Sequence, residues 1–438
     1  MLGLPHVLIK IISYIIVVWE KGFNRIFLIT MLLYKEEGQF VWEGRVMLIR
    51  DGLVFLGGEY VRRDLRVSEG VFLQIEEPGT LGASEGEEVL EAFGKKILPG
   101  LVDIHTHGRA GEDFSFADEA VLKKLCASYA ADGVTAVLAT TMTNEPETMK
   151  RSMAAIAAFC EEQATTGAEG ARVFGVHAEG PFLGEKKKGA HDAAYLWEAD
   201  AEKYEELFAA CGGTLRLLAI DPELDGAETL IHRCKEDGVT VSLAHTACGY
   251  DTACEAAEWG ADHVTHLFNA MQPLHHREPG LIGAAVDKGM YVELICDGIH
   301  LHPAIIRMMF ALCPEKVLLI SDSMQAAGLS DGEYELGGIK VYVKDGKATQ
   351  ADGTIAGSTI SVYDAVVNAI RFGVPEEQAV LSATYLPAKS VGLENETGSI
   401  ECGRAADFIV VDADWNLEAV YIGGKFIKKI FKRSVTFF

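Results

Sequence analysis

Short apolar runs separated by Gly, Asp and Glu occupy both ends of the chain. They lie over 46–49, 53–56 and 71–75, return at 339–343, and recur over 407–411 and 419–425. Runs of this length with turn residues between them are typical of β-hairpins. We therefore expect one small β-sandwich domain that flanks the rest of the protein, built from 31–96 and 396–438, which a β insertion near 333–350 could join.

The middle of the chain shows a different repeating pattern. An apolar run ends in polar residues, and a stretch with helical periodicity follows. We find eight such runs, over 97–104, 135–139, 173–176, 215–220, 239–243, 263–265, 291–296 and 317–320. Helical patterns over 118–132, 146–162, 252–260 and 303–313 lie between runs, as a βα unit requires. The pattern predicts an α/β fold, a TIM (β/α)8 barrel over 97–395, whose chemistry belongs at the carboxyl ends of the strands.

The first thirty residues do not fit either pattern. The apolar run over 7–18 is interrupted by Lys10 and is shorter than the ~20 residues that a membrane helix needs. A basic segment and a small-residue cleavage site, which mark a signal peptide, are missing. Since a strand-like pattern begins at Met31, we interpret 1–30 as a non-native or disordered extension, with a membrane anchor and an amphipathic surface segment as alternatives.

Charge and cysteine content narrow the class of protein. The 438 residues carry a formal charge of −25, which disfavours nucleic acid because phosphate binding needs a basic face. The nine cysteines are scattered without a C-x-x-C pattern, which argues against a disulfide framework or a thiolate zinc site. We expect a cytoplasmic protein that binds neither nucleic acid nor a membrane.

Potential metal ligands gather at the ends of five of the eight predicted strands. All histidines except His6 lie between 105 and 302. A lone H-x-H pair is a weak signal, and each ligand taken singly could be a core histidine, a helix-start carboxylate or a cap. The tips carry His105 and His107, then Glu179, His245, His266 and Asp322.

Taken together, these tips suit a divalent metal ion. Imidazole nitrogens and carboxylate oxygens without a thiolate are ligands for a hard or borderline cation, such as zinc or iron. Alternate residues of an extended chain face the same side, so His105 and His107 can converge on one ion. The sequence therefore predicts metal-assisted hydrolysis.

Several segments resemble the N-acetylglucosamine-6-phosphate deacetylases, a family within the amidohydrolase superfamily. The segments are HAEGPF at 177–182, KGAH at 188–191, THLFNAM at 265–271, PLHHREPG at 273–280 and DGIH at 297–300. The resemblance extends from Met31 to about Lys425. It implies a deacetylase that acts on a phosphorylated amino sugar.

The resemblance also implies roles for individual residues. Glu179, His245 and His266 would hold the principal metal ion. His105 and His107 make a second site possible, with Glu179 bridging, but some family members lack this pair, so the resemblance implies either one or two ions in each subunit. Asp322 would be the catalytic acid and base, and His191 would contact the acetamide carbonyl. The implied substrate-binding residues are Ala190, His191, Asn269, Ala270, Arg277, Asp297, His300, Ile355, Ala356 and Gly357.

Within that set, Arg277 and His300 would meet the 6-phosphate. In this family the equivalent of Arg277 can reach the neighbouring subunit's site, which implies a homodimer.

Other hydrolases and an inactive protein are the alternatives. The sugar could be N-acetylgalactosamine 6-phosphate. Dihydroorotase-like and dipeptidase-like enzymes usually recruit a lysine near strand four, but here that strand runs into Asp221, Pro222 and Glu223. A catalytically inactive assembly protein would be expected to lose metal ligands, and none is missing from the expected positions.

Overall fold

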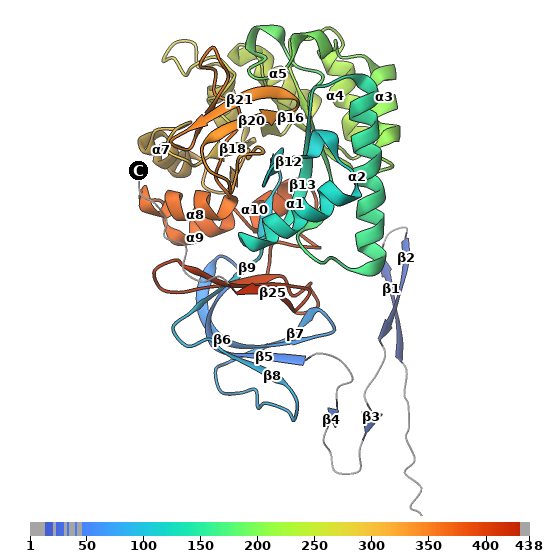
Figure 1. Cartoon of the computed structure of the whole chain (residues 1–438), viewed down its shortest axis with the longest axis vertical. Coiled ribbons are helices and arrows are strands. Elements are labelled where there is room, and N and C mark those ends of the chain that lie inside the picture. Colours follow the sequence, from blue (N-terminus) through green and yellow to red (C-terminus); the bar gives the residue numbers. More distant parts are fainter. Residues whose placement is uncertain (1–13, 21–22, 30–32, 35–39, 42–45, 430–438) are drawn as a thin grey trace, which may run out of the picture.

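Eight parallel strands and the helices around them form the larger part of the molecule (Figure 1). The structure is a computed structural model that describes residues 14–20, 23–29, 33–34, 40–41 and 46–429. Each strand pairs with the next one along the chain. They are β10 (Leu101–Asp103), β13 (Val134–Met142), β14 (Arg172–Glu179), β15 (Leu215–Ile220), β16 (Thr240–Leu243), β17 (His263–Val264), β18 (Tyr291–Ile295) and β19 (Val317–Ile320).

β10 and β19, the first and last strands of the barrel, form no ladder of hydrogen bonds with each other, and bonds near each end of the two strands connect them instead. At the mouth of the barrel, the amide of Asp322 donates to the carbonyl of His105 at 2.9 Å. Lower down, the carbonyls of Ser382 and Ala383 accept from the amides of Leu319 and Val102 at 2.8 and 2.9 Å. These bonds bring the residues that follow β10 and β19 side by side.

Helices surround the barrel because each packs apolar residues against the core. Side chains cap the first residues of some of these helices. Asp118 caps α1 by accepting from the amide of Val121, and Ser361 and Asp364 form a capping box at α8, which satisfies amides that lack a partner within the helix. The helices are α1 (Glu119–Ala131), α2 (Pro146–Thr166), α3 (Ala201–Ala210), α4 (Ala227–Glu236), α5 (Tyr250–Trp259), α6 (Gly280–Lys288), α7 (Pro303–Leu312), α8 (Val362–Arg371), α9 (Glu376–Leu381) and α10 (Tyr385–Ser390).

A second sheet of eight strands lies at the foot of the barrel, at the bottom of Figure 1. Its strand order places the C-terminal strands beside β9, and Phe72 and Phe408 from the two ends of the chain pack at 5.9 Å between ring centroids. Its strands are β5 (Val46–Leu56), β6 (Glu59–Ser68), β7 (Val71–Glu76), β8 (Glu88–Glu91), β9 (Lys96–Pro99), β23 (Phe408–Val411), β24 (Leu417–Ile422) and β25 (Lys425–Lys429). The predicted fold class, a barrel with a flanking β domain from both chain ends, is confirmed.

The predicted strand over 97–104 is divided between the two sheets. β9 pairs with β23 and β5, whereas β10 pairs with β13 in the barrel. The change occurs at Gly100, where a Cβ atom would lie 2.0 Å from Oγ1 of Thr135. An apolar run stays continuous when both halves are buried, so hydropathy does not reveal the change of sheet.

The insertion near 333–350 forms a separate sheet rather than joining the flanking domain. Strands β20 (Gly332–Leu336), β21 (Ile339–Lys344) and β22 (Lys347–Thr349) pair only with one another among the described strands. Their apolar side packs on Met142 and Ala190 beside the barrel mouth. In Figure 1, β20 and β21 lie at the end of the barrel opposite the flanking sheet. The expectation about this insertion is therefore corrected.

The start of the chain is described only in part. β1 (Tyr14–Glu20) pairs antiparallel with β2 (Phe23–Ile29), and β3 (Leu33–Tyr34) pairs with β4 (Phe40–Val41). Residues 1–13, 21–22 and 30 lie outside the described residues, so the interpretation of 1–30 as an extension stays a prediction. Within the described part of the chain, no helix combines the length and apolar character needed to cross a membrane.

Candidate metal centre and active site

The predicted ligands meet at the mouth of the barrel, at or just beyond the ends of five strands. Glu179 is the last residue of β14, and His245, His266 and Asp322 each lie two residues beyond the ends of β16, β17 and β19. His105 and His107 follow β10. All six side chains are buried, with His105 fully so.

One group of ligands forms around one oxygen of Glu179. Its Oε1 atom lies 3.1 Å from Nε2 of His245 and 3.0 Å from Nε2 of His266, and these two nitrogens are 3.1 Å apart. Nε2 of His191 approaches the other oxygen, Oε2, at 3.6 Å. We call Glu179, His245 and His266 the first cluster.

A second group lies on the other side of the same carboxylate. Nε2 of His107 is 3.0 Å from Oε2 of Glu179 and 3.2 Å from Oδ1 of Asp322. Nε2 of His105 is 3.4 Å from that of His107, 3.5 Å from Oδ1 of Asp322 and 3.6 Å from Oε1 of Glu179. We call His105, His107 and Asp322 the second cluster, which Glu179 bridges to the first.

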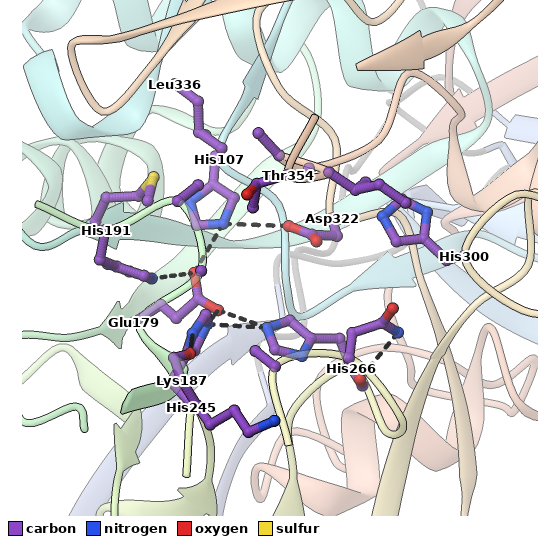
Figure 2. Close-up of a pocket in the computed structure, with 18 of the residues that line it drawn as sticks. His107, Glu179, Lys187, His191, His245, His266, His300, Asp322, Leu336 and Thr354 are labelled. Atoms are coloured by element: carbon purple, nitrogen blue, oxygen red, sulfur yellow. Dashed lines mark hydrogen bonds and ion pairs between the residues drawn. The ribbon is translucent and has the colours of Figure 1, made fainter. Parts of the chain in front are cut away.

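Figure 2 shows the part of this arrangement that lines a cavity. His107, His191, His245 and His266 surround the carboxylate of Glu179, while Asp322 approaches His107. Groups of three potential ligand atoms lie within 4.8 Å of one another, one made of His105, His107 and Asp322 and another of Glu179, His191 and His245. Ligands bound to zinc at about 2.1 Å in a tetrahedron are spaced by about 3.4 Å, so both clusters fit a metal ion.

The hydrogen bonds that His105 and His245 make through Nδ1 favour a cation between their Nε2 atoms and the carboxylates, rather than direct contact between these atoms. Nδ1 of His105 must donate to Oε2 of Glu293 at 2.8 Å, and Nδ1 of His245 must donate to the carbonyl of Lys187 at 2.9 Å, because these oxygens only accept. In the neutral rings Nε2 then carries a lone pair. The lone pair of His245 faces Oε1 of Glu179 at 3.1 Å, a contact between two acceptors that a cation would make attractive.

The pKa shifts of the ligands also favour a cation at this site. Burial opposes ionisation of Glu179, but the charge of His105 and hydrogen bonds from neighbouring histidines hold its pKa well below the usual range. Burial would lower the pKa of His107, but hydrogen bonds to Asp322 and Glu179 and their charges raise it to about 9. The carboxylates therefore attract positive charge into a buried site, which either protons or metal ions can supply.

Three ligand-bearing tips have a backbone conformation that L-residues rarely adopt. His245, His266 and Asp322 have φ values of 46°, 29° and 47°, and such conformations typically cost about 1–3 kcal/mol each. Asp322 is held there because its amide donates to His105 and its carbonyl accepts from Ser358 at 2.7 Å. At these three positions the strained residue is the one that presents a ligand just after the end of a strand.

A cavity of about 400 Å³ opens above the clusters. Met142 and Leu336 provide apolar surface on one side, and Lys186 and Lys187 also line it. The predicted site residues that line it are His107, Glu179, Ala190, His191, His245, His266, Asn269, Ala270, His300, Asp322, Ile355, Ala356 and Gly357. The cavity is therefore polar at its base and partly apolar along its wall.

Comparisons with known proteins agree with this geometry. Residues 97–435 match the model of the amidohydrolase family. The chain is 35% identical over 361 residues to the N-acetylglucosamine-6-phosphate deacetylase of Vibrio furnissii, covering 81% of this chain and 90% of that one. It is 36% identical over 363 residues to the N-acetylgalactosamine-6-phosphate deacetylase of Escherichia coli O157:H7, covering 82% and 93%.

The chain belongs to the amidohydrolase family. Among solved structures, a mutant of the Mycobacterium smegmatis N-acetyl-D-glucosamine-6-phosphate deacetylase, in complex with N-acetyl-D-glucosamine-6-phosphate, matches with a TM-score of 0.81. It is 32% identical and covers 88% of this chain and 100% of that chain. The chain is therefore a metal-dependent hydrolase built on the barrel that the sequence predicts.

Three predicted residues do not line the cavity of this amidohydrolase. His105 lies beneath it, within the second cluster. Asp297 instead accepts from the amides of Ile299 and His300 and contacts Nδ1 of His300 at 2.6 Å. Arg277 is exposed, and its guanidinium donates to Nε2 of His276 at 2.6 Å, so the structure does not bring it to the site of its own chain.

Sequence reasoning missed four residues that contribute to the site. Thr143 contacts Nδ1 of His191 at 2.9 Å, Glu293 contacts His105, and Lys186 and Lys187 line the cavity. A glutamate in the middle of the apolar run over 291–296 was a usable signal, because an ionisable residue in a buried strand needs a partner. Threonine and surface lysines gave no comparable signal.

Proposed function

We propose that this amidohydrolase hydrolyses N-acetyl-D-glucosamine 6-phosphate to D-glucosamine 6-phosphate and acetate, in amino-sugar catabolism. The observation that carries the proposal is the convergence of five imidazoles on Glu179 and Asp322 at the base of a cavity. The names of the Vibrio furnissii and Mycobacterium smegmatis relatives support the substrate.

Either one or two divalent ions per subunit, zinc or iron, would be held by Glu179, His245 and His266 and by His105, His107 and Asp322. A bound divalent ion polarises a carbonyl oxygen and lowers the pKa of a coordinated water from 15.7 to roughly 7. The donor set supports either metal, since it combines imidazole and carboxylate without thiolate.

Asp322 acts as the general base and then as the general acid in this proposal. Burial would raise its pKa, but the charge of His105 and the contact with His107 outweigh burial and lower it. The carboxylate is therefore ionised at neutral pH and can take a proton from the attacking water. Returning that proton to the departing amine lets the amine leave in a neutral form.

His191 stabilises the oxyanion that develops on the acetamide oxygen. Burial lowers the pKa of His191 to about 4, so the ring is neutral at neutral pH. If the hydroxyl of Thr143 donates to Nδ1, the proton of the ring lies on Nε2, which faces the cavity. A preplaced N–H donor of this kind is worth more as negative charge develops on the oxygen.

The remaining lining residues would hold the sugar and its phosphate. Asn269, Ala270 and residues 355–357 form the wall, while His300, Lys186 and Lys187 offer donors to an anion. Arg277 lies outside its own cavity, so we propose that it reaches the phosphate in the partner subunit of a homodimer. Phosphate binding at a distance from the amide supplies energy that positions the reacting bond.

The galactosamine epimer is the second candidate, favoured by the 36% identity to the Escherichia coli deacetylase. Acetate release from N-acetylglucosamine 6-phosphate and from N-acetylgalactosamine 6-phosphate, measured on the same metal-loaded protein, tests both. We expect the larger kcat/KM with the glucosamine compound. A larger value with the galactosamine compound would reverse the assignment, and no acetate from either would refute it.

We also propose a cytoplasmic location. All nine cysteines are free thiols, several of them buried, as expected for a reduced compartment.

A further inference from the structure

Glu293 is a buried carboxylate in the middle of β18, between Val292 and Leu294. Its side chain is fully buried. Alternate residues of a strand share a face, so Glu293 lies on the same side of the sheet as Ile295, which lines the cavity. Glu293 is not among the lining residues and therefore lies one layer beneath the site.

The carboxylate contacts the tips of two ligand-bearing strands. Oε2 accepts from Nδ1 of His105 at 2.8 Å and from the amide of His266 at 3.2 Å. Oε1 is buried without a hydrogen-bond partner among the described residues. A buried charge that leaves one oxygen unsatisfied is costly, so packing alone does not explain a glutamate here.

The contact with His105 has a chemical consequence. A carboxylate only accepts, so Nδ1 of His105 must carry a proton, which leaves Nε2, beside Asp322 and Glu179, as the atom that can offer a lone pair to a metal ion in place of a proton. A negative partner also makes the imidazole a better electron donor to a metal ion. Nδ1 of His107, the other histidine of the second cluster, has no such partner among the described residues.

We propose that Glu293 is a positioning residue that orients His105 and thereby sets the affinity of the second cluster for a divalent cation. The weaker contact with the His266 amide anchors the carboxylate between the two tips. The inference rests on the metal-dependent function proposed above. It assigns Glu293 no contact with substrate.

Zinc titration of the metal-stripped full chain, in competition with a chromogenic chelator, tests the proposal. Glu293→Gln keeps the shape of the side chain and an oxygen that can accept a hydrogen bond, but it removes the negative charge. Glu293→Leu removes the accepting oxygen as well as the charge. We expect the affinity for the second Zn²⁺ to fall by about 10-fold in the Gln variant and about 100-fold in the Leu variant. The affinity for the first Zn²⁺ should change by less than about 3-fold in the Gln variant, because the side-chain oxygen of Gln can still accept from the amide of His266, the ligand of the first cluster that Glu293 contacts.

A double-mutant comparison separates positioning from a general structural role. In a His105→Ala background, Glu293→Gln should have no further effect on zinc affinity, because the residue through which it acts is gone. Glu335→Gln is the matched control, since it removes the same charge from an exposed position on β20. We expect it to leave both affinities unchanged.

Three outcomes would overturn the proposal: a Gln variant with both affinities unchanged, equal losses at both ions, or a wild-type chain that binds one Zn²⁺ only. If the Leu variant fails to fold, the Gln variant and the double mutant decide. Acetate release by the wild type is measured in parallel. Its absence would refute the proposed substrate, while the zinc affinities would still decide the role of Glu293.

Discussion

The two ligand clusters differ in how closely their atoms are drawn together. In the first cluster the separations are 3.0 to 3.1 Å, and in the second they range from 3.2 to 3.5 Å among His105, His107 and Asp322. The first draws its ligands from consecutive or nearby strands, β14, β16 and β17, whereas the second joins β10 to β19 across the closure of the barrel. Because the second depends on bonds outside the strand ladder, we expect its ion to be held less tightly.

Removing the metal should cause the largest loss of activity and should reveal which of the two clusters binds its ion more tightly. Complete stripping with a chelator is expected to reduce activity by at least about 10³-fold, since a bound ion contributes several kcal/mol to transition-state stabilisation. Zn²⁺ or Fe²⁺ should restore it. Metal analysis during stripping should show one ion leaving before the other; activity that survives complete stripping would end the metal hypothesis.

Asp322→Asn should produce the next largest effect. Without a group that accepts and returns the proton, kcat is expected to fall by about 10²- to 10⁴-fold. Metal content measured on the same sample tells whether Asp322 also serves as a ligand of the second cluster. Asp251→Asn, at an exposed position in the first turn of α5, is the control and should leave kcat unchanged; an Asp322 variant with full kcat would remove it from the mechanism.

His266→Ala and His105→Ala compare the clusters directly. We expect the His266 variant to lose more activity, because we propose that the first cluster holds the principal ion. The His105 variant should keep about one ion per chain and lose only the more weakly held one. Metal content and kcat are measured together, and equal losses in both variants would mean that the reaction needs both ions.

Arg277→Ala tests a residue that lies outside both clusters. A charge-assisted contact with phosphate is worth roughly 1.5–3 kcal/mol, so kcat/KM for the phosphorylated sugar should fall by about one to two orders of magnitude. Unphosphorylated N-acetylglucosamine is the control substrate, which both proteins should hydrolyse poorly and almost equally. The same loss with both substrates would show that Arg277 supports its loop or a subunit interface, and His300 would become the next phosphate candidate.

The smallest effect is expected from deleting residues 1–30. A chain that begins at Met31 should be soluble and as active as the longer form, because the described site residues all lie beyond residue 100. Activity and thermal unfolding of the two forms make the comparison. A deletion that prevents folding would show that these residues belong to the domain.

The barrel and most of its ligands could be predicted from the order of residues along the chain. Apolar runs at βα spacing predicted parallel strands, and the ends of such strands meet at one mouth. The sequence therefore groups His105, Glu179, His245, His266 and Asp322 at one site. Two parts of the fold escaped the pattern, the change of sheet at Gly100 and the separate sheet near the mouth, because hydropathy reports burial but not which strand is the neighbour.

The partners that hold the ligands, and the choice of predicted residues that reach the cavity, depend on the folded arrangement of the chain. The partners Glu293 and Thr143 act on His105 and His191 from 188 and 48 residues away in sequence, so no local pattern could pair them. Arg277 belongs to a segment that resembles a substrate-binding motif, but its loop turns it toward solvent. Sequence fixes which groups can ionise or bind a cation, whereas their distances, tautomers and pKa values depend on contacts that form only when strands distant in the chain close into a barrel.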